Sequence, residues 1–141
     1  MPNVYQSGII KASPEEVWRK IRDFNALPQW HPAIASSELE GEPGVGAVRH
    51  FFLKEGGEIR ERLLSLSDHE HSCAYTILES PMPLKNYYAV FRLYPITLSG
   101  TTFMEWYARF DSTDPSTEDE TAEAVEGVFA GGIKSLQEIF S

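Results

Sequence analysis

The apolar residues of this chain change their spacing along its length, from helical to alternating and back to helical. The first helical stretch consists of Val17, Trp18, Ile21 and Phe24. It follows Ser13-Pro14-Glu15-Glu16, where the serine can cap a helix, the proline fits its first turn and the second glutamate completes a capping box. The pattern predicts a short helix that ends near Asn25, and one further short turn up to Trp30.

The middle of the chain has the pattern of strands. Runs rich in Val, Ile, Phe, Tyr and Thr are separated by turn signals built from Gly, Pro, Asp and Ser. A first strand covers 4–11, and six more cover 33–39, 47–54, 58–67, 72–79, 85–97 and 101–111. Because short turns join the later strands, we expect a seven-stranded antiparallel sheet.

A long amphipathic helix is predicted from about Glu120 to Phe140. Its apolar stripe consists of Ala122, Val125, Phe129, Ile133, Leu136 and Phe140. Since no other element is long enough to cover one face of the sheet, we expect an α+β fold whose curved sheet wraps around this helix. Gly127, Gly131 and Gly132 each weaken the helix by about 1 kcal/mol. They indicate a kink or a loose N-terminal half of the helix, room for a ligand beneath it, or both.

Composition places the chain among globular proteins. Its 141 residues suffice for one core, and shares of 42% hydrophobic and 23% charged residues exclude a disordered or fibrous class. The net charge of −9 disfavours nucleic acid and anionic membrane surfaces as partners, since both attract cationic proteins. No run approaches the ~18 apolar residues of a membrane span, and no signal-peptide pattern occurs, so we expect a cytoplasmic protein.

Several kinds of chemistry have no motif in this sequence. Cys73 is the only cysteine, which rules out an internal disulfide and a four-cysteine zinc site. The motifs of serine hydrolases, phosphate-binding loops, dinucleotide-binding folds and zincins do not occur. His69 and His71 lie two residues apart, but in a polar turn we interpret them as exposed rather than metal-binding. We expect no metal and no cofactor.

Several local patterns follow one another in a characteristic order over essentially the whole chain. They are Ser13 to Trp18 with Ile21 and Phe24, Trp30, Arg60-Glu61-Arg62-Leu63, Tyr75-Thr76-Ile77, Leu84-Lys85-Asn86-Tyr87, and Thr102 with Trp106 before Phe110. Together they resemble the START-type helix-grip superfamily (SRPBCC), specifically its bacterial polyketide cyclase/dehydrase branch. The resemblance implies one domain over residues 1–141, with two short helices after the first strand. It also implies a pocket for a hydrophobic small molecule, in a monomer or homodimer.

The segment from Glu61 to Tyr87 is also similar to the plant abscisic acid receptors of the same superfamily. That similarity places a gate loop at 53–57 and a latch loop at 80–84 over the pocket. The gate lacks the receptors' Ser-Gly-Leu-Pro-Ala, and Met82-Pro83-Leu84 replaces their His-Arg-Leu. His31 occupies the position of a receptor lysine that meets the ligand's carboxylate. We therefore interpret the similarity as one of pocket geometry, not of hormone sensing.

Strand alternation and this resemblance together select the residues expected to line the pocket. They are His31, Ile34, Phe51, Leu53, Glu61, Leu63, Tyr75, Ile77, Met82, Leu84, Tyr87, Ala89, Glu105, Tyr107, Gly127, Gly131 and Ser135. Most are apolar or aromatic, which suits a ligand with an apolar body and a few oxygens.

The two glutamates allow more than one interpretation. Glu61 shares a strand face with Ile59 and Leu63, so it either points inward and needs a donor, water or ligand, or faces solvent and pairs with an arginine. In the strand 101–111, hydrophobicity favours the face of Trp106 as core. The resemblance favours the face of Glu105 and Tyr107 as the pocket side, and we follow it. Glu105 would then lie near Glu61, and the two carboxyl groups would share a proton or orient a ligand hydroxyl.

Three functions are compatible with the sequence. The first is binding of an apolar, lipid-like or polyketide-like molecule by a carrier or sensor. The second is a cyclase- or dehydratase-type enzyme, with Glu61, Glu105, Tyr87 and His31 as candidate acid–base residues and His31 at the pocket mouth. The third is a co-chaperone-like interaction domain, which predicts a collapsed pocket.

Overall fold

One antiparallel sheet of seven strands forms the body of the computed structural model, which describes residues 3–141. The strands are β1 (Asn3–Ile10), β2 (Ile34–Glu40), β3 (Val48–Leu53), β4 (Glu58–Ser67), β5 (Ser72–Glu79), β6 (Leu84–Ile96) and β7 (Thr101–Ser112). Their order is β1-β7-β6-β5-β4-β3-β2, so the first strand pairs with the last and the other neighbours follow the chain. The predicted seven-stranded sheet is confirmed.

Two helical elements follow β1, as predicted: α1 (Pro14–Ile21) and the 3-10 helix η1 (Phe24–Gln29). Ser13 caps α1, because its hydroxyl accepts a hydrogen bond from the backbone N–H of Glu16 at 3.3 Å. Asp23 caps η1 in the same way through Asn25, at 3.0 Å.

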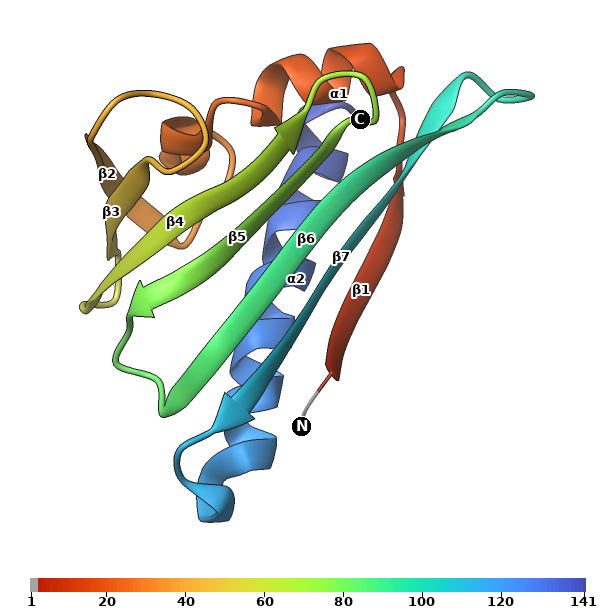
Figure 1. The fold of residues 1–141 in the computed structure, drawn as a ribbon. Helices are drawn as coiled ribbons and strands as arrows, with labels where there is room; N and C mark the ends of the chain where they lie inside the picture. Colours follow the sequence, from red (N-terminus) through yellow and green to blue (C-terminus); the bar gives the residue numbers. More distant parts are fainter. Residues whose placement is uncertain (1–2) are drawn as a thin grey trace.

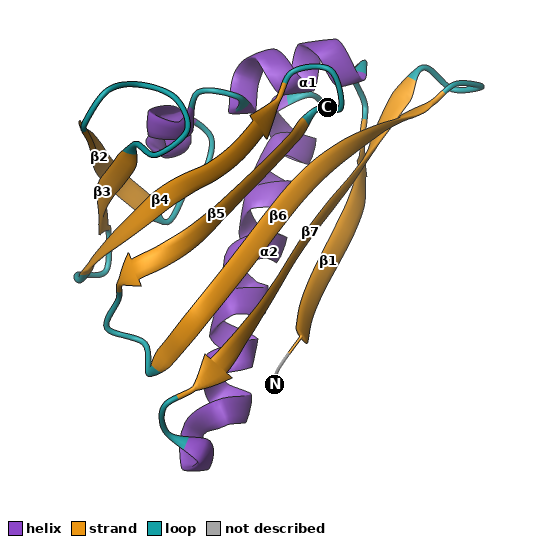
Figure 2. Ribbon diagram, in the orientation of Figure 1, coloured by secondary structure: helices purple, strands orange, loops and turns teal. Residues whose placement is uncertain are grey.

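The long helix α2 (Glu118–Ile139) lies across one face of the sheet, and the sheet curves around it (Figure 1; the helices and strands are coloured separately in Figure 2). It begins two residues before the predicted start, because the 3-10 helix η2 (Pro115–Thr117) leads directly into it. The carboxylate of Asp114 caps η2 by accepting from the backbone N–H of Ser116 at 3.1 Å.

The core lies between α2 and the sheet. The predicted helix stripe supplies Val125, Phe129, Ile133 and Leu136, all buried. The ring of Phe129 stacks on Trp106 of β7, with centroids 4.7 Å apart and planes 14° apart. Burial of these large side chains is the main stabilising term of the fold.

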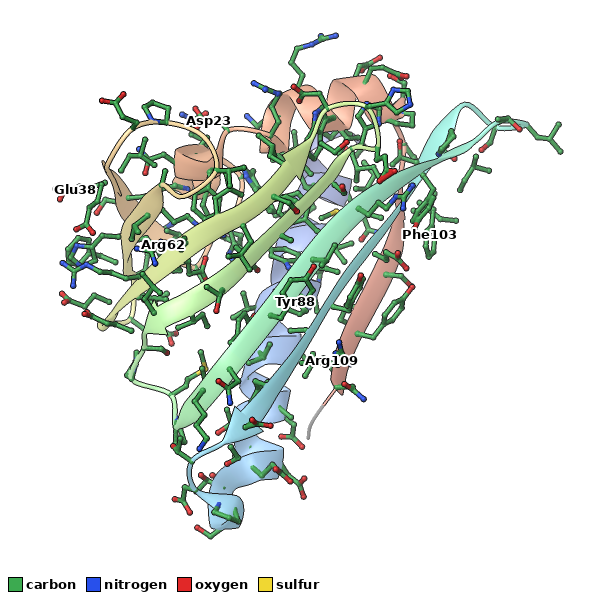
Figure 3. All side chains as sticks on the ribbon, in the orientation of Figure 1. Asp23, Glu38, Arg62, Tyr88, Phe103 and Arg109 are labelled. Atoms are coloured by element: carbon green, nitrogen blue, oxygen red, sulfur yellow. The ribbon has the colours of Figure 1, made fainter. Side chains whose placement is uncertain are left out.

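Strand β7 corrects the predicted choice of face. Its buried residues are Thr102, Met104, Trp106, Ala108 and Phe110, which face α2. Phe103, Glu105 and Tyr107 therefore point to the opposite side of the sheet, and Figure 3 shows Phe103 and Arg109 on that outer side. The prediction that Glu105 and Tyr107 line the pocket is wrong, because the more hydrophobic face of the strand is the one that packs on the helix.

The glycines of α2 line neither the space beneath the helix nor any cavity next to it, which corrects a second prediction. A Cβ atom on Gly132 would lie 2.7 Å from Trp106 and 3.0 Å from His31, so this glycine lets the helix approach the sheet closely. A Cβ on Gly131 would meet only the His31 ring, at 3.8 Å, and one on Gly127 would meet nothing within 4 Å. Gly132 thus serves packing.

These contacts predict opposite effects of alanine at two glycines. Gly132→Ala should lower the free energy of unfolding by about 1–3 kcal/mol, since rigid aromatic rings must move to admit the methyl group. Gly127→Ala should raise it by about 0.5–1 kcal/mol, because alanine favours the helix and finds open space. Urea unfolding of both variants measures this. Equal effects at the two positions would contradict the close approach at Gly132.

Candidate functional site

A small chamber lies between α2, η1 and the inner face of the sheet, and every strand from β2 to β7 contributes to its lining. Its volume is about 50 Å³. Since an ordered water needs ~10–15 Å³, the chamber has room for about four waters. It is lined by Leu27, His31, Ala33, Ile34, Arg49, Phe51, Leu53, Ile59, Glu61, Tyr75, Ile77, Met82, Tyr87, Trp106, Val125, Val128 and Phe129.

A larger vestibule of about 550 Å³ adjoins this chamber on its outer side. The two spaces share the lining residues Ala33, Leu53, Ile59, Met82 and Val128. The rest of the vestibule is lined by Pro32, Lys54, Glu55, Gly56, Pro81 and Ala124. Because five apolar residues line both spaces, the chamber and the vestibule adjoin each other, and we call the two together the path.

Two loops frame the mouth of the vestibule. They are the β3–β4 loop at 54–57 and the β5–β6 loop at 80–83, at the same end of the sheet (Figure 1). A Cβ on Gly57 would lie 3.7 Å from the side chain of Leu53 and 3.7 Å from that of Pro81, so the loops are close to each other. The positions that the resemblance gave to a gate and a latch therefore lie at the mouth.

A buried ion pair marks the inner end of the chamber. The Nε of Arg49 donates to Oε1 of Glu61 at 2.9 Å, and Nη2 lies 2.7 Å from the same oxygen. A third guanidinium nitrogen, Nη1, donates to the backbone carbonyl of Phe24 at 2.9 Å. The guanidinium also lies over the Phe24 ring at 4.0 Å, which adds a cation–π contact. Glu61 therefore points inward and has the donor that its burial demands.

The pair is held by strand register. Arg49 and Glu61 lie opposite each other on the antiparallel strands β3 and β4. The pKa of Glu61 is raised, because burial outweighs the charge and hydrogen bond of Arg49, which act in the opposite direction. The close contacts support an ionised pair with no net charge.

Two tyrosine rings complete the inner chamber. Trp106 Nε1 donates to the hydroxyl of Tyr75 at 3.0 Å, and the Tyr87 ring lies 6.3 Å from that of Tyr75. Burial raises the pKa of both phenols well above the ordinary value, so both are neutral donors at physiological pH. They can hydrogen-bond an oxygen atom of a ligand.

His31 connects η1 to α2. Its Nε2 lies 2.7 Å from the carbonyl of Val128, and the backbone N–H of Ala33 donates to Nδ1 at 3.2 Å. A carbonyl only accepts and an N–H only donates, so these partners assign a neutral ring with its proton on Nε2. The hypothesis of a proton carrier at the mouth does not fit, because the side chain is buried and both ring nitrogens are engaged.

The His31 contacts predict a pH dependence of stability. Burial lowers the pKa of His31 in the folded state below its ordinary value of 6.5. Its stabilising contribution is therefore complete above pH ~6.5 and is lost as the pH falls through the folded-state pKa. His31→Gln keeps one donor and one acceptor but does not titrate. Urea unfolding at pH 7.5 and 5.5 should show a larger loss for the wild type than for this variant, and equal losses would contradict the neutral assignment.

Nine of the predicted lining residues lie on the chamber: His31, Ile34, Phe51, Leu53, Glu61, Tyr75, Ile77, Met82 and Tyr87. The others lie elsewhere. Leu63 and Ala89 are buried in the core away from the chamber, while Leu84, Gly127, Gly131 and Ser135 line neither the chamber nor the vestibule. Leu84, the last residue of the proposed latch, already belongs to strand β6.

Glu105 is engaged on the outer face of the sheet. Its two carboxylate oxygens accept hydrogen bonds from the hydroxyls of Tyr5 and Tyr94, both at 3.0 Å. The sheet separates this carboxylate from Glu61, so the two groups cannot share a proton. The predicted carboxylate pair is wrong.

The residues that sequence reasoning missed include Arg49, the chamber's cation. Alternation could have found it, since Phe51 was placed on the pocket side and Arg49 lies two residues before it on the same strand. The other missed residues are Leu27, Ala33, Ile59, Trp106, Val125, Val128 and Phe129. Trp106 was missed through the wrong choice of face on β7.

Within residues 3–141, no group of three or more His, Cys, Asp and Glu side chains is arranged to hold a metal ion. In the same part of the chain, no helix is both long and apolar enough to cross a membrane.

Known proteins resemble this chain in sequence and in fold. It is 31% identical over 133 residues to the abscisic acid receptor PYL7 of Arabidopsis thaliana, an alignment that covers 90% of this chain and 63% of the receptor. The solved structure of the protein XoxI from Bacillus cereus has 35% identity and a TM-score of 0.92, covering 99% of this chain and 96% of that one. The solved structure of a protein from Bacillus thuringiensis has 34% identity and a TM-score of 0.90, covering 99% of this chain and 98% of that one.

The family comparison covers nearly all of the sequence. Residues 1–140 match the family described as polyketide cyclase / dehydrase and lipid transport. The seven-stranded sheet gripping α2 agrees with this match. This chain therefore belongs to the family described as polyketide cyclase / dehydrase and lipid transport, and it has a helix-grip fold.

Proposed function

We propose that this protein binds a small molecule with an apolar body and one polar end, as a carrier or sensor. The observation that carries the proposal is an apolar vestibule that adjoins an inner chamber, with the Arg49–Glu61 pair and two tyrosines among the chamber's lining residues.

The lining supports an apolar ligand body. The walls shared by the two spaces are Ala33, Leu53, Ile59, Met82 and Val128, none of which carries a polar side-chain group that hydrogen-bonds strongly. A ligand that covers this surface gains about 25 cal/mol for each Å² of apolar area removed from water. An open path of this kind also favours ligand binding over a co-chaperone-like domain with a collapsed pocket.

The relatives support the same class of function. PYL7 is an abscisic acid receptor, and the family's description includes lipid transport. Both concern molecules with apolar parts. The enzyme hypothesis loses one of its two supports, the carboxylate pair, since Glu105 is remote from Glu61, and both nitrogens of His31 are engaged. Its other support is the family's description as polyketide cyclase / dehydrase.

A blocked path tests the proposal. Ala33 lines both spaces, so Ala33→Phe should obstruct their junction, whereas Ala35→Phe adds the same side chain outside both. A panel of 4-alkylphenols and fatty alcohols is added at excess, and the melting temperature is measured. Ligand at 100-fold its Kd adds about 2.7 kcal/mol of stability. We expect the melting temperature to rise for the wild type and Ala35→Phe but not for Ala33→Phe. No rise for any compound, or an equal rise in both variants, would overturn the proposal.

A further inference from the structure

We propose that the ligand is uncharged and donates a hydrogen bond from a hydroxyl group, alcohol or phenol, to Oε2 of Glu61. The inference deepens the proposed function and rests on it, since it specifies the chemical class that the chamber selects. It follows from the charges and hydrogen bonds of the chamber.

The inner chamber has no net charge to offer an anion. Its charged lining residues are Arg49 and Glu61, which neutralise each other. His31 is neutral because its partners fix one proton on the ring, and the phenols of Tyr75 and Tyr87 are neutral. A carboxylate ligand would therefore lose its hydration without gaining a free cation, and it would lie beside another carboxylate. Each effect opposes binding.

The hydrogen bonds leave one strong acceptor open. Arg49 donates to Oε1 of Glu61, while Oε2 accepts no hydrogen bond from any residue in 3–141. Glu61 lines the chamber, and only 6% of the residue is exposed, so solvent has little access to it. A carboxylate oxygen in this position prefers an O–H donor, and such charge-assisted bonds are roughly twice as strong as neutral ones.

The charges at the mouth of the vestibule do not change the preference for an uncharged ligand. Its two charged residues, Lys54 and Glu55, have opposite signs and lie on the exposed loop between β3 and β4. Screening by salt weakens their effect on a group at the inner end. Charge selection thus falls to the chamber around Glu61.

Three matched probes test the inference with the wild-type protein. They are 4-butylphenol, 4-butylanisole and 4-butylbenzoate, measured by isothermal titration calorimetry at pH 7.5. We expect the phenol to bind at least about tenfold more tightly than the benzoate, which is charged. The anisole should also bind more weakly than the phenol, because it has no donor.

A charge change at Glu61 should reverse the preference. Glu61→Gln leaves Arg49 with an unneutralised charge, so the benzoate should bind this variant at least as tightly as the phenol does. Glu105→Gln makes the same change on the outer face of the sheet and should leave the preference unchanged. If Glu61→Gln does not fold, the affinities of the three probes for the wild-type protein still test the inference.

The outcomes separate the two proposals. Tighter binding of the benzoate or an equal affinity for phenol and anisole in the wild type would overturn the inference and leave ligand binding intact. An unchanged preference in a folded Glu61→Gln variant would also overturn it. Failure of all three probes and of the wider panel to bind would overturn the proposed function itself.

Discussion

Replacing Arg49 by methionine should lower the free energy of unfolding by about 3–5 kcal/mol, the largest loss from a single polar contact that we expect in this fold. Arg49 is 3% exposed and Glu61 6%, so the variant leaves a carboxylate buried without its partner. The variant also removes the hydrogen bond to the Phe24 carbonyl and the contact with the Phe24 ring. Urea unfolding at pH 7.5 measures the loss.

The double variant Arg49→Met/Glu61→Leu serves as the control. Replacing both members of a buried ion pair by apolar residues of similar volume is often neutral or stabilising, because neither charge then needs to be desolvated. We expect it to recover most of the stability that the single variant loses. A double variant as unstable as the sum of its single variants would show that the pair itself is not the cause.

Trp106→Ala should cost about 3–5 kcal/mol through the cavity it leaves in the core. This residue is 1% exposed, stacks on Phe129 and meets the Phe91 ring edge-on at 5.5 Å. It also donates to the Tyr75 hydroxyl. Since the stack joins β7 to α2, the loss should appear in global unfolding by urea.

Tyr107→Ala, one residue further along the strand, is the matched control. Its side chain lies on the outer face and is half-buried, so its removal should cost less than about 1.5 kcal/mol. Comparable losses at the two positions, or a larger loss at Tyr107, would contradict the assignment of faces on β7.

The elements could be predicted from the sequence because each has a local cause. The capping residues and the apolar stripe give α1, and the spacing from Val125 to Leu136 gives α2. The order of strands follows from the short turns between them. What local pattern does not contain is the pairing of β1 with β7, because these two strands lie far apart in the sequence, with Asn3 opposite Arg109.

The candidate site could be predicted only in part, because it depends on contacts between distant segments. On β7 both faces carry aromatic residues, and the choice between Trp106 and Tyr107 is made by packing against Phe129. The role of His31 depends on a carbonyl that lies 97 residues away in sequence. Simple alternation along the strand could have predicted that Arg49 points inward with Phe51. Without Arg49, no partner for Glu61 could be named.

A methyl NMR titration with 4-butylphenol measures whether a small molecule enters the path and reaches the Arg49–Glu61 pair. We predict that the largest shifts fall on Ile34, Ile59 and Ile77, which line the chamber, and that Ile9, exposed on β1, does not move. The shifts should be lost in Ala33→Phe. Shifts centred on Ile9, or no shifts at saturating 4-butylphenol, would contradict the account.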